Sequence, residues 1–513
     1  MRLPKRVAVA ALAAAVGAGS ASTAVAAAHG KAQSATGGTL TLGTDFVLTT
    51  WSAQNADWGD TTPFYQAVYD TLTRESANHV LEPGLATSWS YNKNHTVLTL
   101  KLRKGVKFTD GTPFNATVAA ENEMRYKHGT GNASYLADMT SAKAVGPYTL
   151  RLYLSEPNPS MLFYLSVDSG LQESPKAFHA STSQTVPVGS GPYELDTSAT
   201  IPGSSYVLTR NPHYWDPAIQ HYSKIVIKVY ASNQAMLDAI EGHQVDAAIT
   251  GFDGSYIPQV KKAGYKVEYY ALGWVGMNLM DRAGKITPAM ANVQVRRALE
   301  YAFNAPAFLQ KIQYNYGYLT EQPFQLQSAA YIKSLNRTYS YNPAKAKTLL
   351  AAAGYPNGFT LTLPTIPGAS NTSLLAVAQQ ELQAIGVKVV YQQLGLGNAL
   401  AELLAPKFSA YIGATANDGS PWNMEEFEIG PDSVWNPFHY TTPYVKGEIH
   451  KMQFGTPAQS LAAARNLNRY VVNQAWFVPW YEQQGFFVSS PATKVTMNPW
   501  NYYPNLWDIT PVS

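Results

Sequence analysis

The stretch Leu102–Glu121 reads LRKGVKFTDGTPFNATVAAE and combines a strand end, a turn and a helix start. Upstream, Leu98 and Leu100 alternate with polar residues, which predicts a strand with one buried face. Asp110 and the glycine that follows it predict a tight turn, and Asn115 predicts the N-cap of a helix. Nothing in this pattern requires a ligand. We therefore expect the stretch to have a structural role, and we look for binding residues elsewhere in the chain.

The length and composition indicate a folded protein with more than one domain. The chain has 513 residues, which predicts about two or three domains rather than a single core. Charged residues make up 14 % and aromatic residues 12 % of the chain. Disordered chains show the opposite balance, because they are rich in charge and poor in aromatic residues.

The charge balance argues against a nucleic acid partner. The formal net charge is +3, and the first 28 residues contain Arg2, Lys5 and Arg6 but no acidic residue, so the rest of the chain is neutral (3 − 3 = 0). A nucleic-acid-binding surface needs basic side chains that displace counterions from the phosphates. Neutrality also argues against attachment to anionic lipid by charge alone.

Cysteine is absent from the sequence. This excludes disulfides, thiolate metal sites, cysteine nucleophiles and a lipoprotein anchor on a cysteine. The 10 histidines are scattered without a metal-ligand spacing such as H-E-x-x-H. We expect no metal site and no cofactor.

The N-terminus is typical of a secretory signal. A basic start is followed by a short apolar run rich in alanine and by Ala-x-Ala sites, which predicts a cleaved signal peptide over residues 1–28. The alternative is an uncleaved membrane anchor, but a run made mostly of alanine is weakly apolar for a spanning helix. Residues 29–37 are predicted to be a polar linker, and the mature protein is expected outside the cytoplasm.

Helical and strand patterns alternate along the remaining chain, which predicts an α/β protein with several sheets. A first strand is predicted over 38–46 and a short helix over 66–73. Asn233 is predicted to cap another helix. The clearest helix follows Asn342, which is expected to cap it, and ends near Gly354, where φ is expected to be positive.

Five segments, in this order and spacing, resemble family 5 solute-binding proteins of ABC-type importers, the peptide- and nickel-binding group. The resemblance covers nearly the whole mature chain. The matching segments are LEPGLATSWSYNKNHTVLTLKLRKGVKFTDGTPFNATVAAENEMRY, VGSGPYEL with LTRNPHYW, AMLDAIEGHQVDAAI, GMNLMDRAG with NVQVRRALEYAFNAPAF, and YNPAKAKTLLAAAGYPNGFTLTL.

The resemblance implies a bilobal periplasmic-binding-protein fold of class C, an α/β architecture with an additional third domain. The ligand would be held between the two lobes. The implied divisions are lobe I over 38–70, 187–271 and 483–513, the extra domain over 71–186, and lobe II over 272–482.

The function implied by the resemblance is binding and delivery, not catalysis. An exported, monomeric binding protein would capture a small ligand in the periplasm or at the cell envelope and pass it to a membrane ABC permease. An oligopeptide or dipeptide is the first expectation for the ligand, and an oligosaccharide or a nickel chelate is the alternative. A secreted glycoside hydrolase and an adhesive surface protein are the alternatives from other classes.

The loop after the strand pattern YIGAT at residues 411–415 holds the first candidate site residues, Asn417, Asp418 and Trp422. In peptide-binding relatives an Asp in the matching loop pairs with the free amine of the peptide. Asn417 stands at that position here, and Asp418 follows it, so the carboxylate is displaced by one residue. The alternative is that Asp418 only closes an Asn-Asp-Gly turn.

Trp274, Phe46 and Trp51 are the aromatic candidates for ligand contact, because aromatic faces suit apolar side chains and sugar rings. Ordinary core packing is the alternative for each of them. Glu425, Glu426 and Glu428 form an acidic cluster with Asp418 and Asp432, and two of its carboxylates are a candidate for the acid and nucleophile of a glycosidase. A solvated loop face or ion pairs are the alternative that we favour for them.

Overall fold

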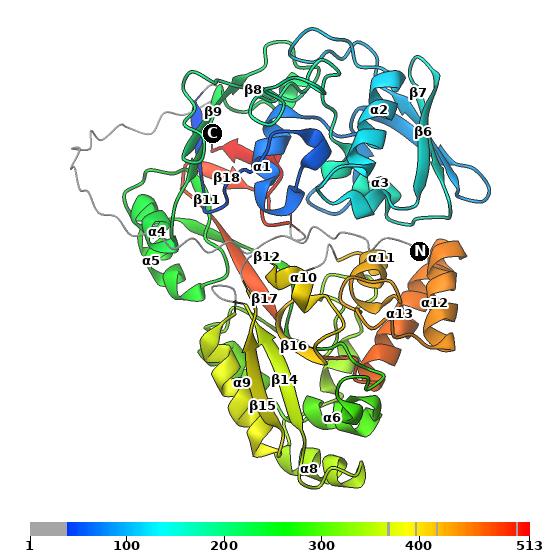
Figure 1. The fold of residues 1–513 in the computed structure, drawn as a ribbon. Helices are drawn as coiled ribbons and strands as arrows, with labels where there is room; N and C mark the ends of the chain where they lie inside the picture. The colour runs from blue at the N-terminus through cyan, green and yellow to red at the C-terminus, as the bar shows by residue number, and fades with distance from the viewer. Residues whose placement is uncertain (1–37, 367–369, 396–397, 417–418, 499–500, 513) are drawn as a thin grey trace. The chain divides into compact units, whose positions relative to one another are not determined.

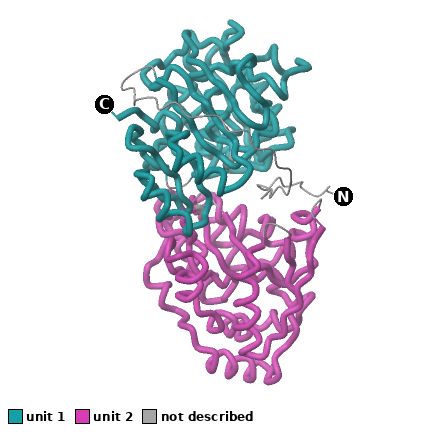
Figure 2. The backbone as a smooth tube through the Cα atoms, turned by 90° about the vertical axis from the view of Figure 1, so that its left-hand side faces the viewer, with its two compact units in different colours: residues 1–10, 15–270, 485–513 teal, residues 11–14, 271–484 magenta. Residues whose placement is uncertain are grey.

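The computed structural model describes residues 38–366, 370–395, 398–416, 419–498 and 501–512. These residues form two compact units (Figure 2). Unit 1 contains residues 38–270 and 485–512, and unit 2 contains residues 271–484. The chain passes from unit 1 to unit 2 within β12 (Lys266–Leu279) and returns within β17 (Phe477–Ser489).

The main sheet of unit 1 is built around three parallel strands. β1 (Thr39–Thr44) lies between β10 (Lys224–Val229) and β11 (Ala247–Ile249) and is parallel to both. On the far side of β10 follow β9 (Ser205–Arg210) and β8 (Tyr193–Leu195), both antiparallel to their neighbours, and β11 pairs antiparallel with β17. Since β1, β10 and β11 run in one direction, their carboxyl ends lie at the same edge of the sheet.

The stretch Leu102–Glu121 begins at the last residue of β5 (Val97–Leu102) and runs into α2 (Ala116–Lys127). β5 belongs to a second sheet of unit 1 with strand order β4-β5-β7-β6, of which Figure 1 labels β6 and β7 beside α2. Leu98 and Leu100 are fully buried, as the alternation predicts. Asp110 accepts a hydrogen bond of 2.8 Å from the backbone N–H of Thr112. Asn115 caps α2 (Ala116–Lys127) by accepting from two backbone N–H groups. The structural prediction for this stretch is confirmed.

Two local predictions in unit 1 are wrong. The helix expected over 66–73 is α1 (Trp58–Val68), which starts earlier and ends before Tyr69. The following residues leave the helix because they pair with distant chain; the backbone N–H of Thr73, for example, donates to the carbonyl of Leu165. The N-cap of α4 (Asn233–Glu241) is Ser232 rather than Asn233.

Unit 2 packs helices against short strands. β14 (Thr360–Thr365) and β15 (Lys388–Gln393) form a parallel pair, β16 (Ala410–Ala414) pairs antiparallel with β12, and β13 (Gly317–Leu319) pairs with β17. The predicted caps of α8 (Pro343–Ala352) are confirmed. Asn342 accepts a hydrogen bond from the backbone N–H of Lys345, and Gly354 has φ +92°.

The remaining elements complete both units. In unit 1 they are η1 (Ala53–Asn55), β2 (Thr73–Glu75), β3 (Leu81–Pro83), β4 (Ala86–Tyr91), β5 (Val97–Leu102), η2 (Ala133–Leu136), β6 (Met139–Gly146), β7 (Thr149–Leu154), α3 (Met161–Tyr164), η3 (Asp168–Gly170), η4 (Pro217–Ile219), η5 (Gly254–Tyr256), α5 (Ile257–Lys262), β18 (Thr493–Val495), η9 (Leu506–Asp508) and β19 (Ile509–Pro511). In unit 2 they are η6 (Pro288–Ala291), α6 (Val293–Glu300), α7 (Ala305–Lys311), η7 (Lys333–Arg337), α9 (Thr372–Ala384), α10 (Ala399–Leu403), α11 (Pro421–Met424), η8 (Glu425–Ile429), α12 (Pro443–Phe454) and α13 (Pro457–Asn473).

Three expectations are not decided by this architecture. The predicted signal peptide (1–28) and linker (29–37) lie outside the described residues. The division into two lobes and an extra domain stays a prediction. Across the parts of the chain that the structure describes, no helix combines the length and apolarity of a membrane span.

Candidate functional site

The carboxyl ends of the parallel strands in unit 1 carry aromatic side chains. Phe46 follows the end of β1 by two residues, and Phe252 follows the end of β11 by three. Open α/β sheets bind ligands outside the carboxyl ends of their strands, where loops bring polar and aromatic groups together. Both phenylalanines are half-buried, so their rings are partly accessible.

These two residues are part of an aromatic cluster of four rings from four chain segments: Phe46, Phe252, Tyr270 and Tyr502. The ring centroids of Phe46 and Tyr502 lie 6.1 Å apart, and those of Phe252 and Tyr502 lie 6.0 Å apart. Tyr270 lies 5.5 Å from each of Phe252 and Tyr502. All four pairs meet edge to face, at 63° to 79°, the arrangement that the ring quadrupoles favour.

Gly485 lies against the Tyr270 ring of this cluster. Tyr270 is 1 % exposed, and its ring lies against the backbone of β17 at Gly485. A Cβ at Gly485 would overlap the ring and hydroxyl of Tyr270. The missing side chain at Gly485 therefore leaves room for Tyr270, which packs against Phe252 and Tyr502.

Trp51, the other aromatic candidate in unit 1, lies in the core. Its side chain is 3 % exposed and packs edge to face against Phe64 and Tyr206, with centroids 6.0 Å and 5.9 Å away. Ligand contact by Trp51 stays a prediction.

In unit 2, Trp274 is buried and hydrogen-bonded. It lies on β12, is 1 % exposed, and packs edge to face on Phe477 at 5.6 Å. Its indole N–H donates to Oε2 of Glu428 over 3.1 Å, and Glu428 is itself fully buried. The indole N–H of Trp274 therefore has its acceptor within unit 2.

Trp422 forms a second indole–carboxylate pair. It belongs to α11, is 7 % exposed, and donates its indole N–H to Oε1 of Glu426 over 3.0 Å. Both acceptors, Glu426 and Glu428, lie in the π-helical turn η8, which follows α11 directly. The expectation of a solvated loop face is wrong for Glu428, because its carboxylate is buried in unit 2 and accepts a hydrogen bond from the Trp274 indole. We call Trp274–Glu428 and Trp422–Glu426 the indole–carboxylate pairs.

Arg282 is a buried arginine of unit 2 whose charge interacts with that of Glu428. Arg282 is 1 % exposed, and its guanidinium lies over the rings of Trp476 and Phe477, 4.6 Å and 5.0 Å from their centroids. Burial lowers the pKa of Arg282 to about 9, and the charge of Glu428 acts in the opposite direction. Glu428 thus has two buried partners, one by hydrogen bond and one by charge.

Asn417 and Asp418 lie outside the described residues, so their contacts stay predictions. The residue Thr415, just before them, contacts β12. The backbone N–H of Thr415 donates to the carbonyl of Trp274 over 3.0 Å, and a Cβ at Gly273 would overlap the carbonyl oxygen of Thr415. Gly273 is therefore needed where β12 and the end of β16 approach.

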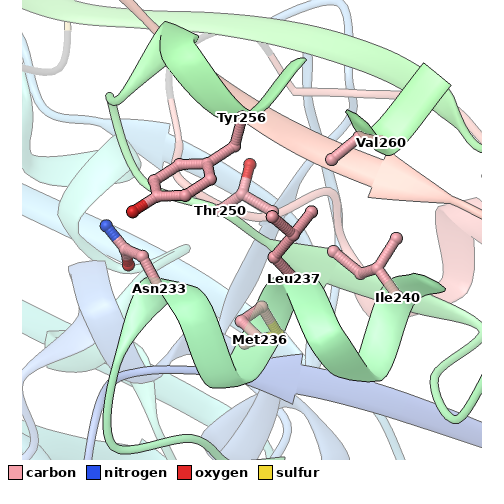
Figure 3. A pocket seen from close by; sticks show the side chains of 7 residues that line it. All are labelled: Asn233, Met236, Leu237, Ile240, Thr250, Tyr256 and Val260. Atoms are coloured by element: carbon pink, nitrogen blue, oxygen red, sulfur yellow. The ribbon is translucent and has the colours of Figure 1, made fainter. Parts of the chain in front are cut away.

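A pocket of ≈ 210 Å³, open solvent included, lies between α4 and α5 in unit 1 (Figure 3). Met236, Leu237 and Ile240 of α4 line it together with Val260, and all four are buried core residues. These side chains belong to the packed core between the two helices, and we assign the pocket no binding role.

Within the described ranges, no group of three or more His, Asp or Glu side chains is arranged to hold a metal ion. The His residues that the sequence scatters are not brought together there.

Sequence reasoning missed Phe252, Tyr270 and Tyr502. For Phe252 a signal exists, since it follows the strand pattern VDAAI and a glycine, as Phe46 follows the first strand. Tyr270 and Tyr502 carry no comparable local signal. Their position depends on chain segments that are more than 200 residues apart.

The chain is similar to characterised binding proteins. It is 28 % identical over 354 residues to the glutathione-binding protein GsiB of Escherichia coli (strain K12), an alignment that covers 66 % of this chain. The match spans 65 % of the length of GsiB.

The fold is shared with solved structures of periplasmic binding proteins. DppA from Helicobacter pylori, in complex with the peptide STSA, matches with a TM-score of 0.77 at 20 % identity, covering 93 % of this chain and 99 % of DppA. NikA from Brucella suis, in complex with Fe(III)-EDTA, matches with a TM-score of 0.78 at 20 % identity, covering 92 % and 100 %. The bilobal α/β architecture expected from the sequence is therefore confirmed.

Family membership follows from the sequence match. Residues 80–428 match the family model described as bacterial extracellular solute-binding proteins, family 5, middle region. The match covers more than half of the chain and includes the stretch at Leu102–Glu121. The chain belongs to family 5 of the bacterial extracellular solute-binding proteins.

Proposed function

We propose that this protein is the solute-binding component of an ABC importer, which captures a small ligand and delivers it to a membrane permease. The observation that carries the proposal is the half-buried aromatic cluster at the carboxyl ends of parallel strands, in a chain that belongs to family 5. Affinity would arise from contacts that are made in the ligand-bound conformation and are absent from the free one.

The proposed ligand is an oligopeptide or a dipeptide. Support comes from the relatives, because GsiB is named for binding glutathione and the DppA structure holds a peptide. An oligosaccharide is the alternative that aromatic side chains also favour. A nickel chelate is the third candidate ligand, and the NikA complex with Fe(III)-EDTA supports including metal chelates among the ligands tested.

The proposed role is binding without turnover. The comparisons give no support to a glycoside hydrolase. Glu426 and Glu428, two of the three glutamates in the candidate acidic cluster, already accept hydrogen bonds from indoles. We propose that these carboxylates support the two tryptophans instead of acting as an acid and a nucleophile.

The proposed ligand contacts are Phe46, Trp51, Trp274, Trp422, Asn417 and Asp418. Phe46 has the strongest support, since its ring is partly accessible at a strand end. We expect Asp418→Ala to weaken ligand binding at least about tenfold, or 1.4 kcal/mol. Unchanged affinity in calorimetry would reject the role of Asp418.

The proposed location is the periplasm or the cell envelope. Export would depend on cleavage of residues 1–28. We propose a monomer without a nucleic acid partner, in line with the neutral charge of the mature chain. Intact mass of the secreted protein tests the cleavage, and light scattering tests the monomer.

The test of the proposed function is native mass spectrometry of the purified full chain, followed by calorimetry. The measurement asks whether a peptide, a saccharide or a metal chelate co-purifies and then binds saturably. A saturable peptide complex that also raises the melting temperature is the expected result. Turnover of a chromogenic glycoside, or the absence of any saturable ligand, would reject the proposal.

A further inference from the structure

Three carboxyl groups are buried in unit 1 where α2 meets the segment 168–174. Glu123 lies on α2, Asp168 is the first residue of η3, and Glu173 follows η3. All three residues are 0 % exposed. Asn122 of α2 joins the two segments, because its side-chain amide donates to the carbonyl of Glu173 over 3.0 Å and its side-chain oxygen accepts from the backbone N–H of Glu173 over 3.1 Å. We call this contact the α2–η3 interface.

Glu123 pairs with an amide rather than with a cation. Its Oε1 accepts from Nε2 of Gln172 over 3.0 Å, whereas Oε2 of Glu123 and Oε1 of Gln172 are buried without a hydrogen-bond partner among the described residues. Both of these oxygens are acceptors when the carboxyl is ionised. A proton on Oε2 would supply the missing donor, and the acid and the amide would then pair through two hydrogen bonds. Burial raises the pKa of Glu123 well above its usual range, against the hydrogen bond from Gln172.

Glu173 is buried near one cation, Arg125 of α2, but it takes part in no ion pair of the described residues. Within the described ranges, neither of its carboxyl oxygens has a hydrogen-bond partner. Burial raises the pKa of Glu173 to about 7, although the charge of Arg125 favours ionisation. Arg125 itself donates to the carbonyl of Phe178 over 3.2 Å. Tyr69, which follows α1, is the other titratable group that faces Glu173.

Asp168 faces groups from α1, α2 and the start of η2. The side-chain amide of Asn132 donates to its Oδ2 over 2.9 Å. The titratable groups that face it are Asp57 and Tyr65 of the α1 region and Tyr126 of α2. Burial raises the pKa of Asp168 to about 7 against the hydrogen bond from Asn132, and the charge of Asp57 adds to the rise. Two carboxyls of the interface therefore change charge close to neutral pH.

The interface also contacts η1 and Trp51. The backbone N–H of Thr130, just after α2, donates to Oδ1 of Asn55, the last residue of η1, over 3.0 Å. The hydroxyl of Tyr69, which faces Glu173, donates to the carbonyl of Trp51 over 2.6 Å. A shift of α2 or of Glu173 would therefore disturb the hydrogen bonds that hold η1 and Trp51.

We propose that the α2–η3 interface is a pH-sensitive contact, closed while its three carboxyls are protonated and loosened as they ionise, so that η1 is released together with α2. Ionisation brings up to three negative charges into a dehydrated interface, and Arg125 can balance one of them. Since the pKa of Asp168 and of Glu173 rises from 3.8 and 4.5 to about 7, their contribution to stability is complete below pH 3.8 and pH 4.5 and is lost as the pH rises through about 7. Glu123 acts in the same direction.

Hydrogen–deuterium exchange of the full mature chain tests this inference, with protection factors corrected for the intrinsic pH dependence of exchange. Between about pH 5 and about pH 8.5, we expect protection of the backbone amides of α2 and η1 to fall at least about tenfold. The amides of α4, elsewhere in unit 1, report unfolding of the whole unit and should keep their protection.

Isosteric variants assign the change to the carboxyls. Asp168→Asn and Glu173→Gln keep the shape of the side chains and cannot ionise. In Glu123→Gln the new amide can donate to Gln172 as the protonated acid would. The triple variant should show the same protection at both pH values, whereas Glu121→Gln, at an exposed position of α2, is the matched control and should keep the wild-type loss. If the triple variant fails to fold, infrared difference spectra of the wild type follow the ionisation of the buried carboxyls directly.

Each other outcome contradicts a stated part of the inference. Equal protection of α2 at both pH values, or infrared spectra without carboxyls that ionise near neutral pH, overturns it. A loss of protection that survives in the triple variant shows that other groups cause it. A loss in α2 without a loss in η1 overturns the release of η1, and a loss that includes α4 shows that unit 1 unfolds as a whole. None of these results bears on the proposed function, which the ligand measurements test separately.

Discussion

Strand β17 contributes to two aromatic regions that are built in different ways. Phe477, at one end of the strand, packs on Trp274 in unit 2, where the indole is buried and hydrogen-bonded to Glu428. Gly485, near the other end, underlies Tyr270 in unit 1, where three neighbouring rings remain half-buried. The aromatic residues of the first region are buried inside unit 2, whereas three of the four rings in the second are half-buried. The same residue type thus has different roles according to burial and hydrogen bonding.

The largest expected effect is on the stability of unit 2. Replacing Trp274 with alanine removes a side chain that is 1 % exposed and leaves Glu428 buried without its indole donor. We expect the free energy of unfolding to fall by about 3–5 kcal/mol. Urea denaturation followed by circular dichroism measures this change.

The matched control for Trp274→Ala is Trp274→Phe, which restores most of the volume but not the hydrogen bond to Glu428. It should recover part of the loss. If Trp274→Ala is no more destabilising than Phe46→Ala, the difference in burial between the two regions does not determine their contribution to stability.

A pH effect of intermediate size should come from Glu482, which lies on β17 between the two regions. Glu482 is 1 % exposed, and burial raises its pKa from 4.5 to about 8, although its Oε1 accepts from the backbone N–H of Leu326. The folded chain therefore favours the protonated carboxyl. Its contribution to stability is fully present below pH 4.5 and is lost as the pH rises through about 8.

Glu482→Gln should remove that part of the pH dependence, which is on the order of 5 kcal/mol between pH 4.5 and 8. Denaturation midpoints of the wild type and the variant at several pH values measure the difference, so that contributions from other carboxyls cancel. Glu121→Gln, an exposed position on α2, is the control and should change nothing. Parallel curves for the wild type and Glu482→Gln would show that Glu482 is ionised throughout.

The smallest effect on stability should come from Phe46→Ala, with a larger effect on binding. Because the ring is half-buried, we expect the free energy of unfolding to change by about 1 kcal/mol. Affinity for the ligand should fall about tenfold, or about 1.4 kcal/mol, since an accessible ring is lost. Calorimetry measures the change in affinity and denaturation measures the change in the free energy of unfolding, both on one preparation. A large loss of stability with unchanged affinity would show that Phe46, like Trp274, contributes mainly to stability.

The predictions from sequence succeeded where neighbouring residues determine the structure. The strand with Leu98 and Leu100, the cap at Asn115 and the helix ending near Gly354 all depend on contacts within a few residues. The helix expected over 66–73 failed because Thr73 pairs with Leu165. Phe46 was found as a candidate because it follows a strand, which is a local signal.

The sequence by itself determined the α/β class and the charge balance, because strand alternation, capping residues and composition are local or summed properties. The family followed from the resemblance of five segments in order and spacing, which is also a property of the sequence alone. Only the tertiary structure decided which aromatic residues are buried. Trp274 meets Glu428 across 154 residues of sequence, and Tyr270 meets Tyr502 across more than 200. Such contacts depend on how the whole chain packs, and no periodicity in either segment encodes them. Burial and hydrogen bonding then distinguish the buried tryptophans of unit 2 from the half-buried rings of unit 1.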